Sequence, residues 1–144
     1  MSAIDELYQE IIIDHNEHPR NEGNLLGATH QAEGYNASCG DELKLFLKIR
    51  GNRIESVKFQ AQGCAISRAS GSIMTDCLQK KTLEEAKQIS SKIQQWFNEN
   101  DEGLDLDLWG DLRALSGVKQ FPMRLKCATL AWHTLDEALK QTDN

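Results

Sequence analysis

The strongest constraint on the fold is an alternation of apolar and polar residues in two neighbouring segments. In the first segment one face carries Leu43, Leu45, Leu47 and Ile49, and the other face carries Lys44, Phe46, Lys48 and Arg50. A period of two is that of a β-strand with one buried face. Gly51-Asn52 provides a turn, and the alternation resumes at Val57, Phe59 and Ala61. The pattern predicts an antiparallel hairpin, and its open end brings Asp41 beside Gly63-Cys64.

Helical spacing of apolar residues is found on both sides of the hairpin. A first helix is predicted from Ser2, with Asp5 completing a capping box, and it ends before Pro19. We interpret His15 on its apolar face as a packed or capping residue rather than a ligand. Further helices are predicted over Ala65–Lys80, from the Thr82/Glu85 capping box to Phe97, over Asp111–Val118, and from Pro122 onwards.

The remaining segments have weaker patterns. Asn98–Gly103 is expected to be an acidic loop, Leu104–Trp109 alternates apolar residues with Asp, and Ala32–Tyr35 carries a weak strand signal. The complete pattern predicts an α+β fold, in which a small antiparallel three-stranded sheet has its helices packed on one face.

Size and charge narrow the class of protein. A chain of 144 residues is expected to form one domain over residues 1–144. The net charge of −6 disfavours nucleic acid, because phosphates attract basic faces. The sequence has no apolar run of the roughly 20 residues that a bilayer span needs, and its start lacks the pattern of a signal peptide. We therefore expect a cytoplasmic protein, with reduced cysteines that act as ligands or nucleophiles.

Three of the four cysteines lie next to the ends of predicted elements. Cys39-Gly40-Asp41 precedes the hairpin, Gly63-Cys64 follows it, and Cys127 lies in the second turn of the last helix. Three thiols and one carboxylate have the chemistry and number of a four-coordinate zinc or iron centre. The spacing of these residues matches no local zinc finger, so spacing alone does not establish a metal site. Each thiol could instead be a buried core residue, and Asp41 could be a solvated loop carboxylate. Cys77 fits the core interpretation, since helical rise places it about 20 Å from Cys64.

A series of motifs runs from the first predicted helix to the last. These motifs are Asp14-His15 with Pro19-Arg20-Asn21 and Gly23, Cys39-Gly40-Asp41, Gly63-Cys64-Ala65-Ile66-Ser67 with Ala69-Ser70, and Lys126-Cys127. Together and in this order they resemble the IscU/NifU-N family of iron–sulfur cluster assembly proteins. The resemblance covers essentially the whole chain.

The chain differs from IscU proteins in three features. In these features it resembles the SufU branch of this family, the sulfur-transfer proteins of Gram-positive bacteria. IscU proteins carry a histidine directly before the last cysteine, where this chain has Lys126. They also carry a Leu-Pro-Pro-Val-Lys chaperone-docking segment, where this chain reads Lys119-Gln120-Phe121-Pro122-Met123-Arg124. The stretch between the second and third motif cysteines is longer, with the surplus placed in the region Asn98–Leu115. Chaperone-assisted cluster hand-off is therefore not expected.

The resemblance implies a zinc ion held by Cys39, Asp41, Cys64 and Cys127. It also implies a SufS-like cysteine desulfurase as partner, within a Suf-type cluster assembly complex. In SufU-type proteins a histidine of the desulfurase displaces one cysteine from the zinc, and the freed cysteine takes the sulfane sulfur. Cys39 is expected to be this acceptor because it lies on a loop flanked by glycine. Arg124 matches an arginine of the SufU motif, where a cation would favour thiolate; a solvated helix arginine is the alternative.

Two other functions are consistent with the same residues. The first is a scaffold that assembles a [2Fe–2S] cluster on the four residues, since thiolates serve both zinc and iron–sulfur centres. The second is a small zinc-stapled interaction module that transfers no sulfur.

Overall fold

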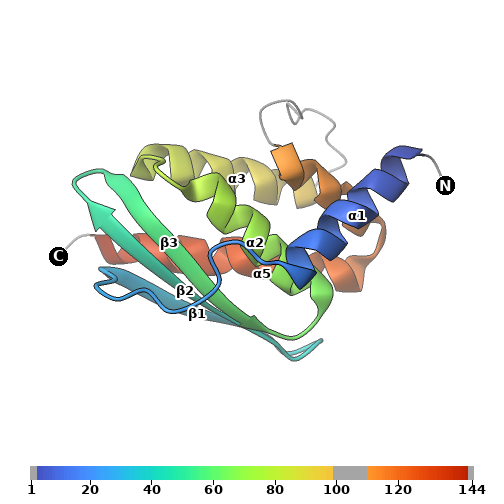
Figure 1. The fold of residues 1–144 in the computed structure, drawn as a ribbon, viewed down its shortest axis with the longest axis horizontal. Coiled ribbons are helices and arrows are strands. Elements are labelled where there is room, and N and C mark those ends of the chain that lie inside the picture. Colours follow the sequence, from blue (N-terminus) through green and yellow to red (C-terminus); the bar gives the residue numbers. More distant parts are fainter. Residues whose placement is uncertain (1–2, 99–109, 143–144) are drawn as a thin grey trace.

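The structure is a computed structural model that describes residues 3–98 and 110–142 (Figure 1). Its elements are α1 (Ala3–Glu17), β1 (His30–Asn36), β2 (Asp41–Arg50), β3 (Arg53–Gln62), α2 (Ala65–Leu78), α3 (Leu83–Asn98), the 3-10 helix η1 (Gly110–Gln120), α5 (Pro122–Leu139) and the short 3-10 helix η2 (Lys140–Thr142). Asn98 ends α3, and the rest of the expected loop Asn98–Gly103 lies outside the described residues, as does the alternating segment Leu104–Trp109.

The predicted hairpin forms two strands of a three-stranded antiparallel sheet with the order β1-β2-β3. Glu42 lies opposite Gln62 at its open end. β1 pairs along the other edge of β2, where Asn36 lies opposite Asp41. The end of β1, the start of β2 and the end of β3 therefore meet at one end of the sheet. The expected α+β fold class is confirmed.

Phe46 departs from the expected alternation of buried and exposed residues in β2. Its side chain is only 5% exposed, although it lies on the opposite face from the buried Leu45 and Leu47. Its cross-strand neighbours are Gln31 and Lys58. Long polar side chains can cover an apolar neighbour with their methylene groups while the polar end stays in water. Phe46 is therefore an aromatic side chain that is buried on the face of the sheet opposite to Leu45 and Leu47.

The helices gather on one face of the sheet, as expected (Figure 1). α5 packs on β1 and β2, α2 packs mainly on β3, and α1, α3 and η1 contact this inner pair of helices. η1 covers the predicted short helix, and its Leu112 and Leu115 are fully buried. No helix within the described residues combines the length and apolar character needed to cross a membrane.

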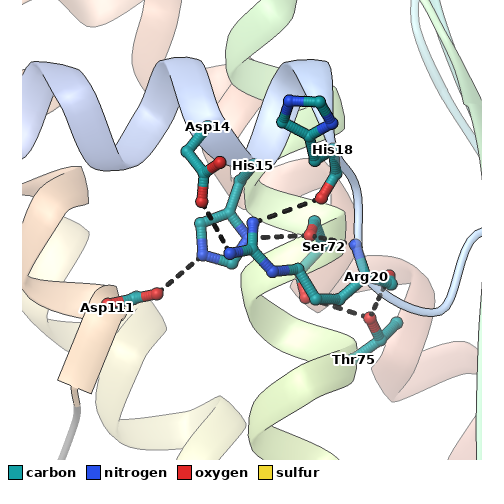
Figure 2. Close-up of polar contacts among 7 residues, drawn as sticks. All are labelled: Asp14, His15, His18, Arg20, Ser72, Thr75 and Asp111. Carbon is teal, nitrogen blue, oxygen red and sulfur yellow. Dashed lines mark hydrogen bonds and ion pairs between the residues drawn. The ribbon is translucent and has the colours of Figure 1, made fainter.

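A buried polar network joins α1 to α2 and η1 (Figure 2). The His15 side chain is 1% exposed, with Nδ1 2.7 Å from Ser72 Oγ and Nε2 2.7 Å from Asp111 Oδ2. Nε2 must donate in the second contact, because an ionised carboxylate only accepts. The interpretation of His15 as a packed residue is confirmed.

Arg20 fixes the segment after α1 to the same part of α2 (Figure 2). Its backbone N–H donates to Ser72 Oγ at 2.8 Å, and its carbonyl oxygen accepts from Thr75 Oγ1 at 3.3 Å. Its guanidinium Nη2 lies 2.6 Å from Asp14 Oδ2, and this hydrogen bond lowers the pKa of Asp14. The motif around Asp14-His15 therefore docks α1 rather than supplying ligands.

Candidate metal centre

The turn between β1 and β2 presents the first two candidate ligands in different environments. The backbone N–H of Gly40 donates to the Asn36 carbonyl at 2.8 Å, and Gly40 has a φ of +72°, which glycine adopts without steric cost. Cys39 lies on this turn and is exposed, whereas Asp41 begins β2 and is fully buried. A single residue, Gly40, thus separates an accessible thiol from an inaccessible carboxylate.

Cys64 occupies the N-cap position of α2, directly after β3. Its sulfur accepts a hydrogen bond from the Ser67 backbone N–H at 3.5 Å, and its own N–H donates to Asp41 Oδ1 at 2.8 Å. The positive end of the helix dipole favours negative charge on a sulfur at this position. Cys64 is therefore anchored both to α2 and to Asp41.

Cys127 approaches the same point from α5 and is fully buried. Its Sγ lies 3.3 Å from the Sγ of Cys39. Beside it, the Ser70 hydroxyl of α2 donates to the Ala128 carbonyl of α5 at 2.6 Å. This buried hydrogen bond ties α2 to α5 next to Cys127.

Donor atoms of Cys39, Asp41 and Cys127 all lie within 4.8 Å of one another. The sulfur of Cys64 lies 3.8 Å from Asp41 Oδ2 and so borders this group. The structure thus brings three of the four sequence-predicted ligands into one cluster and the fourth into contact with it.

The cluster has the chemistry of a cation site. Burial raises the pKa of the Cys127 thiol, and its contacts with Asp41, Cys39 and Cys64 raise it further. A buried thiol beside a carboxylate keeps its proton unless a cation compensates the negative charge. Thiolates with one carboxylate are ligands that Zn²⁺ binds, and its binding releases the thiol protons. The donor set therefore fits zinc.

The other sequence candidates lie outside this cluster. Arg124 is exposed on α5, and among the described residues it makes no hydrogen bond or ion pair with Asp41. Lys126 is also exposed. Cys77 packs half-buried against the core, and burial raises the pKa of its thiol. Among the described residues Cys77 therefore lies outside the group of candidate ligands.

Asn36 is a site residue whose role was not predicted from the sequence. It is buried at the end of β1, and its side-chain Nδ2 lies 3.3 Å from Asp41 Oδ2 and 3.7 Å from Cys127 Sγ. The signal that could have found it is a polar residue placed opposite Asp41 in the β1–β2 register. That register depends on β1, which the sequence indicates only weakly.

The model of the NifU-like N-terminal domain matches residues 7–142 of the chain. The chain belongs to this family. Within the family it is 38% identical over 142 residues to the zinc-dependent sulfurtransferase SufU of Bacillus subtilis (strain 168), covering 97% of this chain and 94% of that protein. It is 35% identical over 144 residues to the iron–sulfur cluster assembly scaffold protein IscU of Streptococcus pyogenes serotype M1, covering 100% and 89%.

A solved structure supports the same family assignment. A SUF-system protein of Fervidobacterium islandicum AW-1, described as an iron–sulfur cluster assembly scaffold, superimposes with a TM-score of 0.85 at 36% identity. The match covers 93% of this chain and 97% of that one. The family expected from the sequence motifs is thus confirmed.

Proposed function

We propose that this NifU-like N-terminal domain protein is a zinc-dependent sulfurtransferase of iron–sulfur cluster assembly. In this proposal Cys39 accepts sulfane sulfur from the persulfide of a SufS-like cysteine desulfurase and passes it on to a Suf-type assembly complex. The similarity to the B. subtilis protein, whose name states zinc dependence and sulfur transfer, supports the proposal.

The observation that carries the proposal is the unequal exposure of the clustered ligands. Cys39 is exposed, whereas Asp41 and Cys127 are fully buried beside it. A partner's persulfide can reach an exposed sulfur, but it cannot reach a sulfur enclosed by packed helices. The difference supports Cys39 rather than Cys127 as the acceptor. In this proposal Asp41, Cys127 and the half-buried Cys64, which is anchored at the N-cap of α2, hold the metal during transfer.

The transfer itself is a thiol exchange without net oxidation. The Cys39 thiolate attacks the terminal sulfur of the desulfurase persulfide, and a new S–S bond forms on Cys39. The S–S bond of the desulfurase breaks, and its cysteine leaves as a thiolate that takes up a proton. Cys39 then carries the persulfide.

Zinc, when bound, would supply positive charge that keeps the site thiols deprotonated. The chain itself supplies the arrangement, because the β1–β2 turn exposes Cys39 while the Cys64 N–H orients Asp41. Arg124 is exposed one helical turn before Cys127. In this proposal it attracts the anionic persulfide or a carboxylate of the desulfurase.

A desulfurase assay with single-site variants tests the proposal. Cys39→Ser is expected to abolish stimulation of a SufS-like desulfurase while part of the zinc is retained. Arg124→Ala is expected to weaken stimulation with full zinc content. Cys77→Ala is the matched control, because it removes the one cysteine outside the cluster and should leave both readouts unchanged. Full stimulation by Cys39→Ser would contradict the proposal and favour an interaction module.

A scaffold that builds a [2Fe–2S] cluster as its product is the second candidate function. It is favoured by the similarity to the S. pyogenes protein, which is named a scaffold, and by a donor set that also suits iron–sulfur centres. Metal and sulfide analysis of the native protein separates the two functions. Stoichiometric zinc in a colourless protein supports sulfur transfer, and a brown, sulfide-bearing protein supports the scaffold.

A further inference from the structure

The side chain of Asn36 contacts two of the candidate metal ligands, Asp41 and Cys127. Its Nδ2 lies 3.3 Å from Asp41 Oδ2 and 3.7 Å from Cys127 Sγ, so one amide group donates toward both. Asn36 is 9% exposed, and Asp41 and Cys127 are fully buried. These hydrogen bonds are therefore shielded from competing water.

The orientation of this amide follows from its neighbours. The side-chain oxygen Oδ1 accepts the Ser38 backbone N–H at 3.2 Å. That contact needs an acceptor, and the contact with the carboxylate oxygen Oδ2 of Asp41 needs a donor. Both conditions are met only with Oδ1 toward Ser38 and Nδ2 toward the cluster. The Asn36 carbonyl also accepts the Gly40 N–H at 2.8 Å, so the turn itself holds the residue.

Cys39 has no such support. Within the described residues its sulfur contacts the sulfur of Cys127 at 3.3 Å, and its side chain is exposed at the turn. The amide of Asn36 reaches Asp41 and Cys127 but has no hydrogen bond with Cys39. The Asn36 amide thus supports Asp41 and Cys127 by hydrogen bonds, and it does not support Cys39.

We propose that Asn36 is a positioning residue that keeps Asp41 and Cys127 as permanent ligands and so leaves Cys39 as the exchangeable one. Amide N–H groups that point at a carboxylate and a sulfur stabilise negative charge on both and orient them for a cation. The inference rests on the proposed function in one respect, because it explains why Cys39 rather than Cys127 is released for sulfur transfer.

Zinc affinity, measured by competition with a chromophoric chelator, tests the first half of this inference. Asn36→Ala removes the donor, and Asn36→Asp keeps the shape while replacing the donor with an acceptor. Both are expected to bind zinc about 10- to 100-fold more weakly than the wild-type protein, as is usual for groups that hydrogen-bond metal ligands. Ser38→Ala is the matched control, because it changes the same turn but keeps the N–H that Asn36 accepts.

Two further readouts separate positioning from a merely structural role. In the cobalt-substituted protein, loss of the hydrogen bond to Cys127 should move the sulfur-to-cobalt charge-transfer band to lower energy, because the thiolate becomes more electron-rich. In the zinc-loaded protein, an alkylating reagent followed by mass mapping should label Cys39 first in the wild type. In Asn36→Ala, Cys127 should become labelled as well.

The outcomes are distinct from those of the sulfur-transfer experiment. Unchanged zinc affinity and an unchanged labelling order in Asn36→Ala would overturn the role of Asn36. The same conclusion follows if Asn36→Ala and Ser38→Ala weaken zinc binding equally. No desulfurase is present in these measurements, so absence of sulfur transfer in the wild type would contradict the proposed function alone. Asn36→Ala introduces no charge, so it gives an answer even if Asn36→Asp fails to fold.

Discussion

At the position of Gly63 a Cβ atom would overlap Oδ1 of Asp41 and lie 2.8 Å from the Asp41 Cα. Gly63 also has a φ of +135°, which disfavours other residues. The missing side chain lets the backbone before Cys64 approach the buried carboxylate, and the Cys64 N–H then donates to it. A single glycine therefore sets the distance between two candidate ligands, Asp41 at the start of β2 and Cys64 at the N-cap of α2.

Replacement of Gly63 by alanine should damage the site more than backbone strain alone explains. Gly23 is a matched control, because its φ is +136° and an added Cβ there meets no atom within 4 Å. Gly23→Ala is expected to lower the free energy of unfolding by about 1–3 kcal/mol through strain. Gly63→Ala should lower the free energy of unfolding by about 1–3 kcal/mol more than Gly23→Ala does, because the added Cβ overpacks the contact with Asp41. Urea denaturation measures both values.

Zinc titration of the same two variants completes this test. Gly63→Ala should bind zinc about tenfold or more weakly, since displacement of Asp41 disturbs the ligand set. Gly23→Ala should keep the affinity of the wild type. Equal behaviour of the two variants in both measurements would show that the contact with Asp41 has no special importance.

At the scale of elements, α1 is held by polar contacts that the helical pattern alone does not reveal. The sequence places His15 on the apolar face of a helix, but its partners Ser72 and Asp111 come from α2 and η1, far along the chain. The register of the hairpin, by contrast, follows from a local alternation and was predictable. Local patterns define elements, whereas contacts between elements depend on the packing of all of them.

His15→Ala should destabilise the protein without touching the metal cluster. The variant loses one buried and one partly buried hydrogen bond, at about 1 kcal/mol each, and leaves a void, so a loss of about 2–4 kcal/mol in the free energy of unfolding is expected. His18→Ala is the control, since this exposed neighbour contributes to the network of Figure 2 only through its carbonyl. Chemical denaturation of both variants checks the prediction, and an equal loss in His18→Ala would refute it.

At the scale of the whole molecule, one core cluster combines residues of the sheet, α2, α3, η1 and α5. Because the described residues 3–98 and 110–142 share this core, we expect them to unfold in a single cooperative transition. One domain over residues 1–144 stays a prediction. The candidate ligands come from the β1–β2 turn, the start of α2 and α5. A cation at this point would therefore join the sheet to both inner helices.

Removal of zinc should therefore lower the thermal stability of the whole protein. A ligand that binds only the folded state adds about 2.7 kcal/mol at a free concentration 100 times its dissociation constant. Thermal unfolding followed by circular dichroism should give a lower midpoint after chelation. Cys127→Ser is the control, because chelation should change its midpoint much less. An identical midpoint with and without zinc in the wild-type protein would contradict a shared metal site.

The sequence by itself determined the hairpin, the order of the helices and the proximity of Cys39-Gly40-Asp41 to Cys64, because strand alternation and turn residues act between near neighbours. Only the tertiary structure decided that Asn36 points at two ligands and that Phe46 is buried on the outer face. It also brings Cys127 to Cys39, an approach that the family resemblance implies but no local pattern predicts. These features depend on how α5 and β1 pack against β2. Packing between elements depends on the shape of the entire core, and no short sequence pattern predicts that shape.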